Sequence, residues 1–75
     1  MDIIEAQENL LKYLEKISYK YNLDPYSDDG FEYCCRLPEI YYCCRLIGID
    51  NDVISENEDV GKQRAINKLK EIYGD

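Results

Sequence analysis

Hydrophobic and polar positions near the N-terminus recur with the period of an α-helix. Six apolar or neutral positions alternate four and three residues apart: Ile3, Gln7, Leu10, Leu14, Ile17 and Tyr21. This spacing places them on one face of a helix. The residue before a proline is disfavoured in the helical region, so Asp24-Pro25 is expected to end this helix. Asp28, Asp29 and Gly30 then predict a turn.

The middle of the chain carries a near-repeat of six residues, in which Glu32–Leu37 is followed nine positions later by Tyr41–Leu46. Alternating side chains in both copies predict two antiparallel strands that turn at Pro38-Glu39. In that register Glu32 lies opposite Arg45, and opposite charges facing each other across a strand pair are favourable. The apolar face of this hairpin would carry Phe31, Tyr33, Cys35, Leu37, Tyr42, Cys44 and Leu46.

The C-terminal third predicts one more strand and a closing helix. Gly48–Asp52 is typical of a turn, Val53–Glu56 of a short strand, and Asp59 of a helix cap, with Gly74 as the helix stop. The buried stripe of this helix would be Ala65, Ile66, Leu69, Ile72 and Tyr73. We therefore expect a single α+β domain over residues 1–75. Its order would be helix, three-stranded antiparallel sheet, helix, with both helices on one face of the sheet.

The net charge and the length of the chain limit the kinds of partner that we expect it to bind. The chain has 75 residues, a net charge of −7 at pH 7 and no histidine. A small acidic body repels nucleic acid and membranes and suits a cationic protein surface. No apolar stretch has the length of a membrane span, and the N-terminus has no pattern of a secretory signal, so we expect a cytoplasmic location.

Candidate chemistry is sparse, and we expect no enzyme and no cofactor. Hydrolytic triads and catalytic zinc sites ordinarily use histidine, and the chain has no phosphate-binding glycine loop. Adjacent cysteines, Cys34-Cys35 and Cys43-Cys44, lack the spacing of zinc ligands, so free thiols are expected, with zinc or a disulfide as alternatives. A calcium loop starting at Asp50 fails, because Ser55 and Gly61 stand where it needs glycine and glutamate.

An acidic run gives the candidate binding residues. The run has no basic residue, and its carboxylates are those of Asp50, Asp52, Glu56, Glu58 and Asp59. Asp28 and Asp29 form a second candidate cluster. The function predicted from these residues is non-enzymatic binding to a cationic surface of a nucleic-acid-handling protein. An alternative interpretation of the run is a solvated turn followed by a helix cap.

Two family resemblances bear on this function. The expected element order, with Lys62-Gln63-Arg64-Ala65 on the last helix, resembles the double-stranded-RNA-binding domain, which implies phosphate binding by that helix. The short turn at Pro38-Glu39, Gly61 in place of serine and the nearby carboxylates depart from that family, so direct nucleic-acid binding is not expected. The resemblance leaves, as an alternative function, a degenerate module for protein–protein interaction or homodimerisation. Its expected contact surface is Arg36, Tyr41, Cys34 and Cys43.

The second resemblance follows from Val53–Asp59, taken as a strand that runs into an acidic turn. This segment resembles part of the small acidic anti-CRISPR proteins of phages, some of which share the same expected element order. The resemblance implies that carboxylates imitate DNA phosphates and occupy the arginine-lined site where an RNA-guided nuclease reads its adjacent motif.

Overall fold

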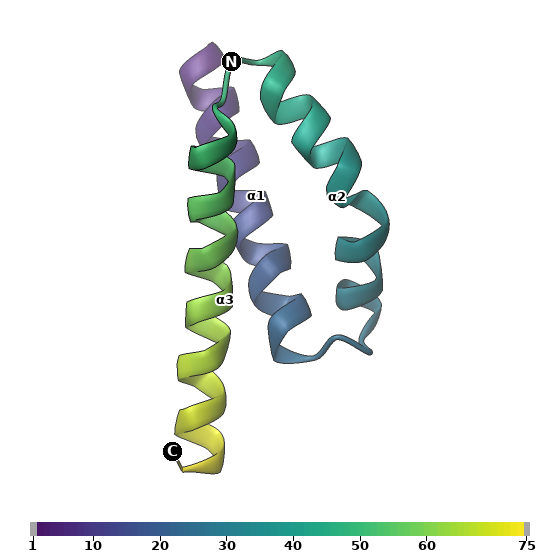
Figure 1. Cartoon of the computed structure of the whole chain (residues 1–75), viewed down its shortest axis with the longest axis vertical. Helices are drawn as coiled ribbons and strands as arrows, with labels where there is room; N and C mark the ends of the chain where they lie inside the picture. Colours follow the sequence, from purple (N-terminus) through teal and green to yellow (C-terminus); the bar gives the residue numbers. More distant parts are fainter. Residues whose placement is uncertain (1, 75) are drawn as a thin grey trace.

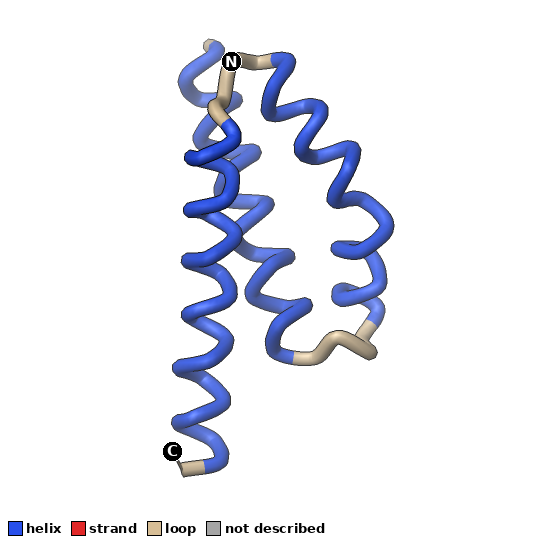
Figure 2. Tube along the Cα trace, in the orientation of Figure 1, coloured by secondary structure: helices blue, strands red, loops and turns tan. Residues whose placement is uncertain are grey.

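The chain is all-helical, which makes the expected α+β fold wrong. The computed structural model describes residues 2–74, except for the side chain of Asp29, and contains three helices and no strand over that range (Figures 1 and 2). The helices are α1 (Ile3–Leu23), α2 (Asp28–Leu46) and α3 (Asn51–Tyr73). In Figure 1, α1 and α3 run in the same direction side by side, and α2 returns antiparallel to both. The expected sheet, with two helices on one face, does not exist in the described chain.

The first helix is the element that the sequence predicts best. The side chain of Asp2 caps α1 by accepting a hydrogen bond from the backbone N–H of Glu5 at 2.8 Å. The helix ends at Leu23, directly before Asp24-Pro25, as predicted. The loop that connects α1 to α2 consists of residues 24–27. Asp28-Asp29-Gly30 is therefore the first turn of α2, and the turn predicted there is wrong.

The expected hairpin is instead the second helix. Ser27 caps α2 by accepting a hydrogen bond from the Gly30 N–H at 3.1 Å, and Pro38 lies inside the helix where a strand turn was expected. A helical spacing underlies the apparent alternation, because Tyr33, Ile40 and Cys44 recur seven and four residues apart and are all buried. Packing of this face against α1 therefore overrides the strand preference of tyrosine and the helix penalty of proline.

The nine-residue repeat gives α2 two similar faces. Nine residues make two and a half helical turns, so equivalent positions of the two copies face opposite sides. Tyr33 is buried while its equivalent Tyr42 is exposed, and Cys44 is buried while its equivalent Cys35 is exposed. We call the exposed set Phe31, Cys35, Tyr42 and Leu46 the outer face of α2.

The third helix contains the expected strand and the expected closing helix, so Asp59 lies inside α3 and the cap predicted there is wrong. Of the turn predicted at Gly48–Asp52, residues 48–50 do connect α2 to α3, and Asn51 and Asp52 are already helical. It starts at Asn51, so the strand predicted at Val53–Glu56 is wrong, and Ile54 within it is fully buried in the core. Gly74 ends α3 with a left-handed φ of 73°, as predicted for a helix stop. The predicted stripe holds for Ala65, whereas Ile72 and Tyr73 are exposed because α3 extends beyond the end of α1 (Figure 1).

The tightest packing in the molecule joins α1 and α3. Gly61 lies against α1, where an added Cβ would approach Ser18 Cβ to 2.9 Å and the carbonyl oxygen of Glu15 more closely still. Ala65, the next small residue on this face, is fully buried. The Ser18 hydroxyl donates a 2.7 Å hydrogen bond to the backbone carbonyl of Glu58 on α3. Small side chains therefore set the close approach of these two helices, and this fixes α3, which carries the acidic run.

Candidate functional site

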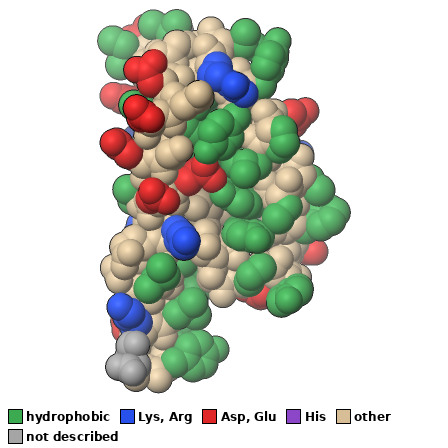
Figure 3. All heavy atoms as spheres, viewed as in Figure 1, with side chains coloured by type: hydrophobic (Ala, Val, Ile, Leu, Met, Phe, Trp, Pro, Cys, Tyr) green, Lys and Arg blue, Asp and Glu red, His purple; other side chains and the backbone are tan. Residues whose placement is uncertain are grey.

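Three residues of the predicted contact set form an outward stripe on α3. Asp52, Glu56 and Asp59 are four and three residues apart, so they share one side of the helix, and all three are exposed. In Figure 3, acidic side chains gather along the upper part of α3, which is its N-terminal half. We call these three residues the acidic stripe.

The carboxylates of the acidic stripe form no ion pair with a described residue. The ion pairs that join two described residues are Arg36–Glu32, Arg64–Glu15 and Lys68–Glu71. Like charges four apart on a helix repel by about 0.2–0.5 kcal/mol. Asp52 lies in the first turn of α3, where the helix dipole offsets part of that cost. The stripe therefore presents to solvent three carboxylates that have no ion-pair partner among the described residues.

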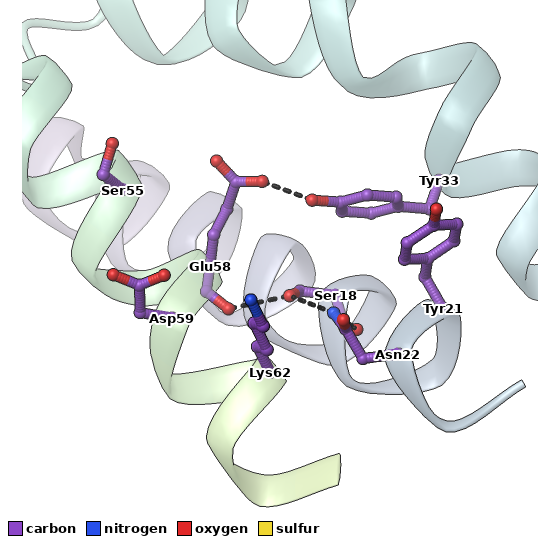
Figure 4. A pocket seen from close by; sticks show the side chains of 8 residues that line it. All are labelled: Ser18, Tyr21, Asn22, Tyr33, Ser55, Glu58, Asp59 and Lys62. Carbon is purple, nitrogen blue, oxygen red and sulfur yellow. Dashed lines mark hydrogen bonds between the residues drawn. The ribbon is translucent and has the colours of Figure 1, made fainter. Parts of the chain in front are cut away.

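Glu58, the fourth residue of the predicted set, points the other way. Its carboxylate accepts hydrogen bonds from the hydroxyls of Tyr33 and Tyr41, both on α2, and its backbone carbonyl accepts from Ser18 on α1. Figure 4 shows the carboxylate directed from α3 toward Tyr33. Glu58 is partly buried and connects all three helices, so it lies outside the outward stripe, and its role in partner binding stays a prediction.

The pKa values of both tyrosine hydroxyls are raised in this environment. Burial first, and then the hydrogen bond to Glu58, raises the pKa of the Tyr33 hydroxyl well above its ordinary value. The same two causes raise the pKa of Tyr41. Both phenols are consequently protonated donors at neutral pH, and they hold the Glu58 carboxylate between them.

The remaining predicted residues do not join the stripe. Asp50 is exposed and occupies the N-cap position of α3, but its side chain makes no capping hydrogen bond. Asp28 begins α2 at the opposite end of the molecule from the start of α3 (Figure 1). The side chain of Asp29 lies outside the described part of the structure. The expected second cluster is therefore not part of one continuous surface with the stripe.

A cavity of about 270 Å³ lies beside the stripe. Its lining comes from all three helices and includes Asp59, which also belongs to the stripe, together with Glu58 and Lys62 (Figure 4). On the opposite wall the rings of Tyr21 and Tyr33 stack with centroids 4.8 Å apart. The sequence analysis missed this cavity and the two tyrosines that bind Glu58. Tyr33 and Tyr41 are about two helical turns apart, so they lie on similar sides of α2 only if that segment is a helix, and it was expected to be a hairpin.

The cysteines have no site of their own. Cys34, Cys35, Cys43 and Cys44 are all unpaired in the structure, and the residues that the structure describes contain no group of three His, Cys, Asp or Glu side chains that could hold a metal ion. Burial raises the pKa of the Cys44 thiol, which keeps it protonated at neutral pH. The other three thiols are exposed. The contact surface expected for the alternative function is also divided, because Tyr41 turns inward to Glu58.

Comparison with protein-family models, with curated proteins and with solved structures returned no match. The two resemblances therefore gain no support, and the element order on which both depend is wrong. Val53–Asp59, expected as a strand and an acidic turn, is continuous helix. Across residues 2–74, none of the three helices has the length and apolar character needed to cross a membrane.

Proposed function

We propose that this chain is a non-enzymatic acidic binding protein that occupies a cationic, nucleic-acid-binding surface of another protein. The observation that carries the proposal is the acidic stripe: three exposed carboxylates on one side of α3, with no ion pair to any described residue. Such a stripe attracts a basic surface at long range and can pair with its arginines or lysines at contact.

The spacing of the stripe suits this role. From Asp52 to Asp59 the helix rises about 10 Å. One strand of duplex DNA places a phosphate about every 3.4 Å of its axis, so this length covers about three phosphate spacings, or about four phosphates. A rigid helix therefore presents three carboxylates over a length that holds about four phosphates, in a geometry that a phosphate-binding groove can accept. The α1–α3 packing at Gly61 holds this helix in place.

The test uses a guide-loaded type II RNA-guided nuclease as the cationic probe, because that enzyme reads a short duplex motif with arginines. Displacement of a labelled duplex from the nuclease is followed by fluorescence anisotropy. The test variant carries Asp52→Asn, Glu56→Gln and Asp59→Asn together. A matched control makes the same charge change at the exposed residues Glu5, Glu8 and Glu39.

The unmodified chain and the control variant are expected to displace the duplex, and the stripe variant to need roughly tenfold more protein. The effect should shrink as salt rises, because exposed charges are screened. If the unmodified chain displaces nothing, or if the stripe variant matches the control, the proposal is wrong.

A second candidate function is self-association through the outer face of α2. Its supporting observation is exposure: Phe31 is 70%, Tyr42 61% and Leu46 66% accessible, on a helix whose other face is buried. Gel filtration with multi-angle light scattering tests it. A dimer that persists at high salt and dissociates with Tyr42→Glu favours self-association, whereas a monomer at all concentrations contradicts it.

A further inference from the structure

The lining of the cavity beside the acidic stripe carries more negative than positive charge. Glu58 is partly buried and accepts two phenol hydrogen bonds, but it forms no ion pair with any residue the structure describes. Removing a carboxylate from water is costly unless a cation accompanies it. Asp59 adds a second carboxylate to the lining, and Lys62 contributes the one basic group there. The lining thus carries one more negative than positive charge.

The opposite wall of the cavity offers aromatic surface. Tyr21 and Tyr33 stack at an interplanar angle of 24°, and both line the cavity with Glu58 (Figure 4). A planar cation is attracted to the face of such a ring, and arginine exploits this attraction more often than lysine. Aromatic surface and carboxylates in one cavity therefore suit a guanidinium group.

The molecule already binds one guanidinium with the same two types of partner. Arg64 places its guanidinium 4.6 Å from the centre of the Tyr19 ring, and its Nη1 lies 3.1 Å from a carboxylate oxygen of Glu15. There the arginine belongs to the chain itself. The cavity brings together a tyrosine wall and a carboxylate in the same way, but no arginine of the described chain lines it.

We infer that this cavity is a socket for a single guanidinium group, supplied by an arginine side chain of the partner protein. The inference rests on the proposed function and adds to it the residue that the partner contributes. A volume of about 270 Å³ accommodates one side-chain head and is below the usual range for larger ligands. Asp59 belongs to both the socket and the acidic stripe, so a partner lying along the stripe can place an arginine in the socket.

Substitution of Lys62 distinguishes a cavity that binds the partner's arginine from a cavity whose charge is balanced within the chain. If Lys62 were the counter-ion that the cavity needs, Lys62→Gln would lower the free energy of unfolding measured without the probe, whereas a cavity open to an external guanidinium should leave that free energy little changed. If the cavity receives an external guanidinium, Lys62 competes with it, and Lys62→Gln should tighten binding.

The probe is N-acetyl-arginine methylamide, with N-acetyl-lysine methylamide as the matched control ligand, titrated into the intact labelled chain and followed by NMR chemical shifts. We expect the arginine probe to shift the signals of Tyr21, Glu58 and Asp59, and to bind roughly threefold more tightly than the lysine probe. Asp59→Asn should weaken binding roughly threefold, and Lys62→Gln should strengthen it by a similar factor. Glu8→Gln, which removes a carboxylate from an exposed position outside both the stripe and the cavity, is the matched control and should change little.

Absence of shifts at the cavity, equal binding of the two probes, or weaker binding by Lys62→Gln would overturn the socket. Circular dichroism on each variant verifies that the helices are intact. The outcomes remain separable from the proposed function. A chain that displaces nucleic acid but does not bind the arginine probe refutes the socket alone. A chain that binds the probe but displaces nothing refutes the proposed function alone.

Discussion

The α1–α3 pair and the second helix are held to the molecule in different ways. The pair is in close backbone contact, with Gly61 and the fully buried Ala65 at the interface. The second helix packs one face against α1 through Tyr33, Ile40 and Cys44, and it touches α3 far less. Its main polar connection to α3 is the pair of hydrogen bonds from Tyr33 and Tyr41 to Glu58.

Because of this difference, we expect the α1–α3 pair and α2 to have different roles. The α1–α3 pair is a rigid support that displays the acidic stripe on its outer side. The second helix closes one wall of the cavity and leaves its own outer face in solvent. Regions with fewer buried contacts open more readily, so local opening should start at α2.

The largest effect is expected where the two supporting helices are closest. Gly61→Ala in a free helix would gain about 1 kcal/mol from helix propensity. Here the new methyl group meets the backbone of α1, so we expect the free energy of unfolding to fall by about 2 kcal/mol, measured by urea denaturation. Gln63→Ala, at an exposed position of the same helix, is the control and should change little. An unchanged or raised stability for Gly61→Ala would refute the tight contact.

A smaller effect should follow from weakening the link between α2 and α3. Glu58→Gln keeps the shape of the side chain but replaces two charge-assisted hydrogen bonds with neutral ones, at a cost of about 1 kcal/mol. Hydrogen exchange should increase in α2 more than in α1 or α3. Glu56→Gln on the stripe is the matched control. Equal exchange increases in all three helices would show that α2 is not the separately held part.

The same link predicts a loss of stability in alkali. An unfolded tyrosine titrates near pH 10. Burial and then Glu58 raise the pKa of Tyr33 in the folded chain, so above pH 10 the folded chain keeps a proton that the unfolded chain releases. This stabilisation is complete below pH 10 and is lost as the pH rises toward the higher folded pKa, since stability falls where the folded state binds more protons. Thermal unfolding with Tyr33→Phe as reference checks this, and the variant should show a shallower alkaline decline.

The smallest effect is expected on the outer face of α2. Tyr42→Glu should change the free energy of unfolding of the monomer by no more than about 0.5 kcal/mol, because Tyr42 is exposed. The equivalent change in the other copy of the repeat, Tyr33→Glu, is the reference and should be more destabilising than Tyr42→Glu, because Tyr33 is buried. Comparable losses in the two variants, measured by denaturation at low protein concentration, would contradict the assignment of one buried and one exposed face.

The sequence predicts part of this fold, and the limits have physical causes. Local signals at Asp24-Pro25 and Gly74 are strong because breakers and helix stops act within a few residues, and the C-terminal ends of α1 and α3 follow them. The second helix was missed because tyrosine and a central proline favour a strand turn, whereas its helical state depends on burial against α1. The acidic run was found from charge alone, but the grouping of Asp52, Glu56 and Asp59 on one side of a helix was not, because the segment was expected to be a strand and a turn. The inward turn of Glu58 could not be found, because it depends on two tyrosines of a helix that had been read as a hairpin.

The central claim is that the acidic stripe makes the contact with a cationic partner. The most direct measurement is the affinity of the chain for the guide-loaded nuclease at several salt concentrations, compared between the stripe variant and its charge-matched control. We predict that the control keeps the steep salt dependence of the unmodified chain, and that the stripe variant binds more weakly with a shallower dependence. Identical affinities and identical salt dependence in the two variants would contradict the claim.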